Sequence, residues 1–156
     1  MKYARLSLDD LKDLEKEFVD FLVLNGIVAE DWEKLKAEDI EAAEKIIDQF
    51  SDVIWESVLR KVEMLELRRK DFLTICMVKD NELTTMVVKT PYKELDLTKD
   101  EIISDVIENI DNHEVTIRKD VITKSASEQL FEFIKVGFYI TKNSAYKRLF
   151  EKKVLQ

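Results

Sequence analysis

Four acidic side chains recur at every fourth position in the segment EKIIDQFSDVIWESVLR, which spans residues 44–60. They are Glu44, Asp48, Asp52 and Glu56. Each step of four residues along a helix turns the side chain by only about 40°, so these four acids line one side of a helix as an acidic ridge. Trp55 falls on the same side, outside the apolar arc of the helix. Carboxylates in a row attract cations, and an adjacent tryptophan can anchor a protein partner.

Three interpretations of the acidic ridge are open. In the first, the ridge is a solvated surface and Trp55 covers an edge of the core, because each like-charge pair costs only about 0.2–0.5 kcal/mol. In the second, the ridge is a recognition face for a basic protein partner. In the third, it binds a divalent cation. The recognition hypothesis assigns partner binding to five residues: Glu44, Asp48, Asp52, Trp55 and Glu56.

Histidine and cysteine each occur once, which restricts the catalytic chemistry open to the chain. His113 lies in the polar segment DNHEV, where we expect an exposed turn residue. Cys76 lies between Ile75 and Met77, where nothing local activates a thiolate, so we expect a buried structural cysteine. The sequence has no glycine-rich phosphate loop and no G-x-S-x-G motif. It therefore predicts no catalytic residue, no metal ligand and no cofactor.

An enzyme is the alternative that these residues leave open. A small carboxylate- and histidine-dependent enzyme, or a metal-dependent hydrolase, needs His113 and at least two acids to converge in a concave pocket. With 33 acidic residues in the chain, chance pairs of carboxylates are unavoidable. The sequence favours a non-enzymatic protein over an enzyme.

Length and composition predict one cytoplasmic domain over residues 1–156. A chain of this size buries roughly 70% of its unfolded surface, so it needs neither a disulfide nor a metal to fold. Its single cysteine allows no intrachain disulfide, which is typical of a reducing compartment. No run approaches the roughly 18 apolar residues that would cross a membrane, so we expect no membrane partner.

Charge is distributed unevenly along the chain, whose net charge is −8. Residues 1–56 carry seven basic and 16 acidic side chains, whereas residues 125–156 carry six basic and three acidic ones. The acidic half argues against nucleic-acid binding, which depends mainly on lysine and arginine. The basic segment is a candidate partner for the acidic half, within one chain or by self-association between two copies. Its cations in the terminal helix are Lys147, Arg148, Lys152 and Lys153.

The first 60 residues predict helices. Ser7 is the expected N-cap of a helix that ends at Gly26. A short helix is expected over residues 30–39 and a longer one from about 39 to 60, where the apolar positions follow a 3.6-residue period.

The following residues predict an antiparallel meander, because the segment is rich in β-branched residues and contains turn signals. We expect strands near 62–67, 71–78 and 83–89, with Asp80 and Asn81 as a two-residue turn.

The remaining chain predicts helices that return to cover the sheet. These are a helix capped by Thr98, a helix opened by Ser125 and a terminal helix, with short strands at about 115–118 and within FYIT, residues 138–141. The expected fold class is α+β, with N-terminal helices, a central antiparallel meander of three to four strands, and C-terminal helices packed on it.

The segment FSDVIWESVLRKVEMLE resembles a small family of uncharacterised bacterial proteins of similar length, whose function is not established. MKYARLSLDDL, WEKLK and ITKNSAYKRL are similar to the same family, so the resemblance covers nearly the whole chain. It implies a free-standing cytoplasmic domain and brings no activity, ligand or catalytic residue. The residues themselves lead to the hypothesis of a non-enzymatic protein-interaction module whose partner has a basic surface.

Overall fold

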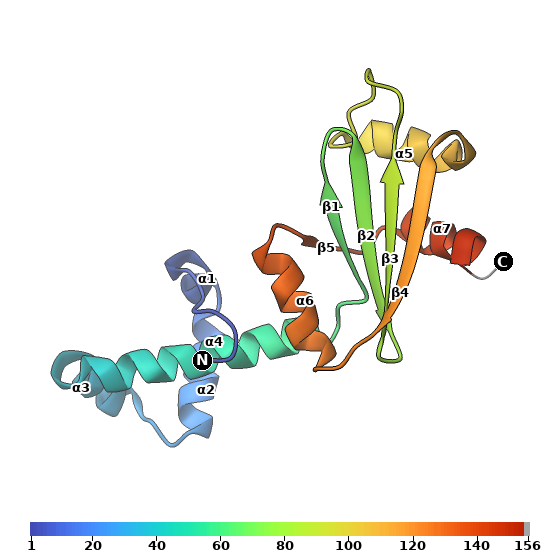
Figure 1. Ribbon diagram of the computed structural model, residues 1–156. Helices are drawn as coiled ribbons and strands as arrows, with labels where there is room; N and C mark the ends of the chain where they lie inside the picture. The colour runs from blue at the N-terminus through green and yellow to red at the C-terminus, as the bar shows by residue number, and fades with distance from the viewer. Residues whose placement is uncertain (155–156) are drawn as a thin grey trace. The chain divides into compact units, whose positions relative to one another are not determined.

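The structure is a computed structural model that describes residues 1–154. The chain divides into two compact units, Met1–Leu59 and Arg60–Gln156 (Figure 1). The single domain expected from the sequence stays a prediction, because two parts of one domain can each be compact.

The first unit is helical. Its elements are α1 (Leu8–Asp13), α2 (Glu15–Leu24), α3 (Ala29–Glu38) and α4 (Ile40–Leu59). The predicted cap at Ser7 is confirmed, since its hydroxyl accepts a 3.1 Å hydrogen bond from the N–H of Asp10. The first predicted helix is interrupted at Leu14, whose φ of −103° and ψ of 20° lie outside the helical range.

Aromatic side chains hold the helices of the first unit together. Phe50 of α4 is 1% exposed and packs edge-on against Phe18 of α2, with ring centroids 5.0 Å apart. Phe18 also contacts Trp32 of α3 at 5.2 Å. Gly26, at φ +72°, ends α2 in the left-handed conformation expected at this position, and the next N–H, of Ile27, bonds back to the carbonyl of Leu22. These contacts fix which side of α4 faces the other helices.

The second unit contains a five-stranded antiparallel sheet in the order β4-β3-β2-β1-β5 (Figure 1). Its strands are β1 (Met64–Arg68), β2 (Phe72–Lys79), β3 (Glu82–Lys89), β4 (Glu114–Val121) and β5 (Tyr139–Thr141). The predicted meander is therefore confirmed, with one strand more than expected. Asp80 and Asn81 both have positive φ, at 52° and 61°, as the predicted two-residue turn requires.

Helices α5 (Asp100–Glu108) and α7 (Ser144–Val154) cover one face of the sheet and enclose the core of this unit. Their side chains meet sheet residues that include Leu73, Ile75, Met86 and Val88. On the opposite face, Leu65 and Cys76 are also 0% exposed. The middle of the sheet is therefore covered on both sides, as its doubly apolar pattern predicts.

Two helix caps were predicted in the second unit, and the structure confirms one of them. Thr98 does not cap α5: its N–H and its hydroxyl both bond to the carboxylate of Asp96, and Lys99 occupies the cap position. Ser125 does cap α6 (Ala126–Lys135), because its hydroxyl accepts a hydrogen bond from the N–H of Glu128. Within residues 1–154, no helix combines the length and the apolar character needed to span a bilayer.

Candidate functional site

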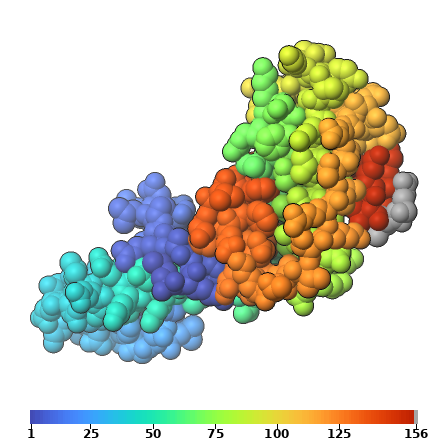
Figure 2. All heavy atoms as spheres, viewed as in Figure 1, coloured from blue at the N-terminus to red at the C-terminus, as the bar shows by residue number. Residues whose placement is uncertain are grey.

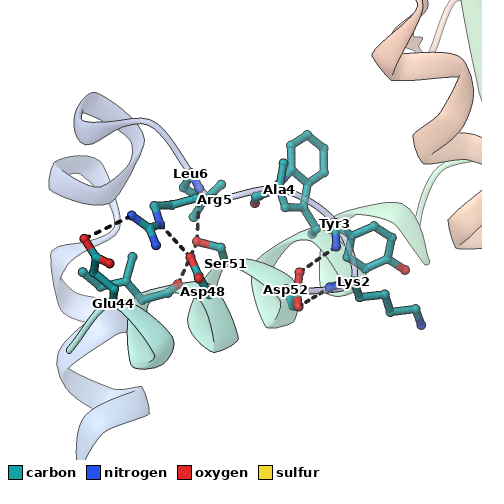
Figure 3. A network of polar contacts seen from close by, with 11 residues as sticks. Lys2, Tyr3, Ala4, Arg5, Leu6, Glu44, Asp48, Ser51 and Asp52 are labelled. Atoms are coloured by element: carbon teal, nitrogen blue, oxygen red, sulfur yellow. Dashed lines mark hydrogen bonds and ion pairs between the residues drawn. The ribbon is translucent and has the colours of Figure 1, made fainter. Parts of the chain in front are cut away.

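The acidic ridge of α4 lies beneath the first six residues of the chain, which run along it in an irregular conformation (Figure 3). The side chains of Asp48 and Glu56 are each only 25% exposed, whereas that of Glu44 is 53% exposed. Most of the ridge is therefore partly covered. We call residues 1–6 the N-terminal segment.

Asp52 binds the main chain of the N-terminal segment. One carboxylate oxygen accepts a 2.7 Å hydrogen bond from the N–H of Lys2, and the other accepts a 2.8 Å bond from the N–H of Tyr3 (Figure 3). Two N–H groups on one carboxylate form a charge-assisted arrangement, which is stronger than a pair of neutral hydrogen bonds. Asp52 therefore binds the start of the segment through main-chain groups, and these bonds do not depend on which side chains the segment carries.

Two further side chains of α4 bind main-chain groups of the segment. Trp55 donates a 3.0 Å hydrogen bond from Nε1 to the carbonyl of Ala4. Ser51, which is 0% exposed, accepts a 3.1 Å bond from the N–H of Leu6 and donates its hydroxyl to the carbonyl of Ile47. The tryptophan thus joins the acids because it binds the same segment that they bind.

Arg5 supplies a cation to the N-terminal end of the ridge, at Glu44 and Asp48. Its Nε donates a 2.6 Å hydrogen bond to Asp48, and its Nη1 lies 3.9 Å from a carboxylate oxygen of Glu44 (Figure 3). The hydrogen bond from Arg5 lowers the pKa of Asp48, and the same bond raises the pKa of Arg5.

The other end of the ridge meets Lys2 and Tyr3. Nζ of Lys2 lies 3.5 Å from Glu56, and the hydroxyl of Tyr3 donates a hydrogen bond to the same carboxylate. Burial raises the pKa of Tyr3, and the neighbouring Glu56 raises it further. Every acid of the ridge thus has a contact from the N-terminal segment, and the structure brings all five predicted partner-binding residues to one surface.

The sequence prediction did not identify the N-terminal segment as the group that covers the ridge. A signal was present, because Lys2 and Arg5 are two of only seven cations within the strongly acidic first 56 residues. The terminal helix was the predicted basic element, yet two of its lysines pair inside the second unit. Lys147 lies 2.5 Å from Glu63, and Lys153 lies 3.0 Å from Asp111.

His113 lies at a bend, as predicted, but it is half-buried, so the prediction that it is exposed is wrong. It follows the short 3-10 helix η1 (Ile110–Asn112) and packs edge-on against the ring of Tyr92, at a centroid distance of 5.8 Å. A surface hollow of about 310 Å³ near the ends of β2, β3 and β4 is lined in part by Asp71 and Glu114, without His113. In the described part of the chain, no three His, Cys, Asp or Glu side chains are grouped so as to hold a metal ion.

Cys76 is buried as expected, at 0% exposure. Burial raises the pKa of its thiol to about 11, while a contact of 3.8 Å with the hydroxyl of Thr85 acts in the opposite direction. A thiol in this state is not a nucleophile near neutral pH.

A second polar cluster, absent from the sequence predictions, lies beneath α5 and α7. Glu66 of β1 is 1% exposed, and its Oε1 lies 2.8 Å from Nε of Arg68. Arg68 in turn donates a 2.6 Å hydrogen bond to Asp100 and lies 3.4 Å from the hydroxyl of Tyr146. Burial, followed by the adjacent Glu66 carboxylate, raises the pKa of Tyr146 well above its usual value and that of Tyr139 to about 12.

The sequence pattern MLELR does not predict that Glu66 and Arg68 are buried. Met64, Glu66 and Arg68 alternate with two leucines, which by period alone places the charged pair on a solvent face. In the structure that face carries the core under α5 and α7, so the glutamate is buried with its arginine. This Glu66–Arg68 cluster joins a strand to two helices, and we assign it a structural role.

Comparison with known proteins gives one match. No curated protein and no solved structure matches the chain. One family model matches almost the whole of it, over residues 1–154, and that extent agrees with the family resemblance seen at both ends and in the tryptophan-containing segment of α4. The chain belongs to DUF6495, a family of unknown function.

Proposed function

We propose that the protein is a non-enzymatic protein-interaction module whose acidic ridge binds a basic, extended segment of a protein partner. One observation carries this proposal: the ridge already binds such a segment, namely residues 1–6 of its own chain. The intramolecular contacts support the proposal by indicating which chemical groups suit the ridge.

The ridge binds main-chain groups, which any extended peptide provides. Asp52, Ser51 and Trp55 together engage three N–H groups and one carbonyl of the N-terminal segment. These contacts do not depend on the side chains of the bound segment. A segment from another protein could therefore make the same contacts.

The ion pairs add selectivity for basic residues. Asp48 and Glu44 face Arg5 at one end of the segment, and Glu56 faces Lys2 at the other. A partner segment should therefore carry cations three residues apart. Opposite charges across such a surface also favour encounter between the partners, and more strongly at low salt.

The ion pairs of the bound segment are weak enough to exchange with those of a partner. The side chains of Arg5 and Lys2 remain 42% and 45% exposed, and ion pairs at such exposure contribute little to stability. A partner segment that makes additional contacts beyond the ridge can therefore replace residues 1–6.

We include a cytoplasmic location in the proposal, which the single cysteine supports, and expect neither a nucleic-acid nor a membrane partner.

A labelled peptide tests the proposal directly. The full-length chain carrying Lys2→Ala and Arg5→Ala has a weakened segment of its own, and it is titrated against the peptide MKYARLS with a fluorophore at its C-terminus. We expect saturable binding by fluorescence anisotropy, weakened roughly tenfold when Asp48→Asn is added. Wild-type protein should bind more weakly, because its own segment competes at an effective concentration on the order of millimolar.

The matched control peptide is MEYAELS, in which both cations are reversed. The double variant must keep its helical circular dichroism for the comparison to count. If the folded variant shows no saturable binding up to about 1 mM, or binds both peptides equally, the ridge is not a recognition surface for basic segments.

A further inference from the structure

Strand β4, four of whose eight residues are charged, forms one edge of the sheet in the second unit (Figure 1). It is eight residues long, contains no proline, and pairs with β3 in unbroken register from Glu114 opposite Lys89 to Val121 opposite Glu82. The other edge, β5, has only three residues. Long, regular edge strands are ready-made templates for another strand.

The outer side of β4 offers backbone groups at known positions. Ile122, directly after the strand, donates its N–H to the carbonyl of Asn81 on the β3 side. Because successive residues of an antiparallel strand direct their backbone groups to opposite sides, Val115, Ile117 and Lys119 direct theirs outward. An added strand would therefore bond to these residues.

The charges on β4 favour one of the three registers that are centred near the middle of the strand, on Thr116, Ile117 or Arg118. In a symmetric antiparallel pair, one residue faces its own copy across a twofold axis. Centring the pair on Ile117 places Glu114 opposite Asp120, and centring it on Arg118 places two arginines together. Both arrangements oppose like charges, which is destabilising.

Centring the pair on Thr116 produces the opposite result. Glu114 of each copy then faces Arg118 of the other. The side chain of Arg118 is 77% exposed and already lies 2.9 Å from Asp120 of its own strand, so the pairing would give it a second carboxylate. On the face toward α5 and α7, Val115 lies opposite Ile117 of the second copy. Both are half-buried and pack on the core, so this pairing would continue the apolar face from one sheet into the next.

We propose that β4 is a self-association edge, through which a second copy of this chain pairs antiparallel about Thr116. Figure 2 shows the segment around β4, in light orange, at the surface of this unit. The inference concerns a different surface from the acidic ridge and does not depend on the proposed function.

Cysteine cross-linking tests the register. In this pairing the two Thr116 residues form a non-hydrogen-bonded pair with Cα atoms about 4.5 Å apart, within the range for a disulfide. Thr116→Cys should therefore give a covalent dimer under mild oxidation. Lys119→Cys is the matched control, because its two copies would lie about 20 Å apart and the Glu114–Arg118 pairs stay in place. Cys76 does not interfere, since it is 0% exposed.

Charge reversal provides an independent test by analytical ultracentrifugation of the full chain. We expect wild-type protein to dimerise reversibly, Glu114→Arg to weaken the dimer roughly tenfold, and the added Arg118→Glu to restore it. The inference is overturned by a wild-type monomer up to about 1 mM, by equal cross-linking of the two cysteine variants, or by failure of the double reversal to restore the dimer.

Discussion

The carboxylate of Asp48 accepts a 2.6 Å hydrogen bond from Nε of Arg5, which lies 43 residues earlier in the chain. This contact accounts for a row of acids that would otherwise only repel one another along α4. Like-charge neighbours cost a helix a few tenths of a kcal/mol per pair, and a cation placed between Asp48 and Glu44 offsets that cost. The helix thus accepts the acidic ridge because the N-terminal segment covers it.

Asp52 should contribute to stability through its two main-chain hydrogen bonds. We expect Asp52→Ala to lower the free energy of unfolding by about 2 kcal/mol, because hydrogen bonds to a charged group contribute about 1.5–3 kcal/mol. Urea denaturation followed by circular dichroism measures the change. Gln49→Ala, an exposed position on the same helix, is the control and should change stability by less than about 0.5 kcal/mol. Equal effects at the two positions would contradict the role of Asp52.

Trp55 should act through both its N–H group and its bulk. Trp55→Phe removes the hydrogen bond to Ala4 and should cost about 1 kcal/mol. Trp55→Ala also removes a half-buried ring and should cost about 3 kcal/mol, at the low end of the range for large core truncations. Thermal melts of the two variants separate these contributions. If Trp55→Ala melts at the same temperature as the wild-type protein, the ring does not contribute to the stability of the fold.

Arg68 should be the most sensitive position of the Glu66–Arg68 cluster. Arg68→Ala leaves the carboxylate of Glu66, whose side chain is only 2% exposed, without its cation. Breaking a buried pair in this way costs about 3–5 kcal/mol. The control is Lys70→Ala, an exposed position two residues later, which should cost less than about 0.5 kcal/mol in the same denaturation experiment. A small loss for Arg68→Ala would show that water already reaches Glu66.

Cys76 should make stability depend on alkaline pH. The pKa of its thiol is about 11 in the folded protein and about 8.5 in an unfolded chain. Between these values the folded state holds the proton that the unfolded state has lost, so stability falls as the pH rises from about 8.5 to 11. The difference in unfolding free energy between wild type and Cys76→Ala, measured at several pH values, should shrink across this window. A constant difference would contradict the raised pKa.

The same thiol gives a simpler measurement near neutral pH. Because Cys76 is 0% exposed, a thiol reagent should label it much more slowly in native protein than in denaturant. Equal labelling rates would show that the sheet opens easily around β2.

The features that the sequence predicts well depend on neighbouring residues. Ser7 and Ser125 are caps because a hydroxyl accepts the hydrogen bond of an N–H three residues later. The Asp80–Asn81 turn follows from side chains that tolerate positive φ between two apolar strands. Local competition can also defeat such rules, as at Thr98, where Asp96 binds the hydroxyl that was expected to cap α5.

The sequence by itself also determined that four acids and Trp55 share one side of α4, since a helix of fixed pitch leaves no alternative. Only the tertiary structure decided that Asp52 binds the start of the chain and that Glu66 is buried beside Arg68. It also decided that β4 is an edge strand. These outcomes depend on which distant segments meet. Period and charge describe how a segment can pack, but the segment that it meets is selected by the free energy of the whole fold.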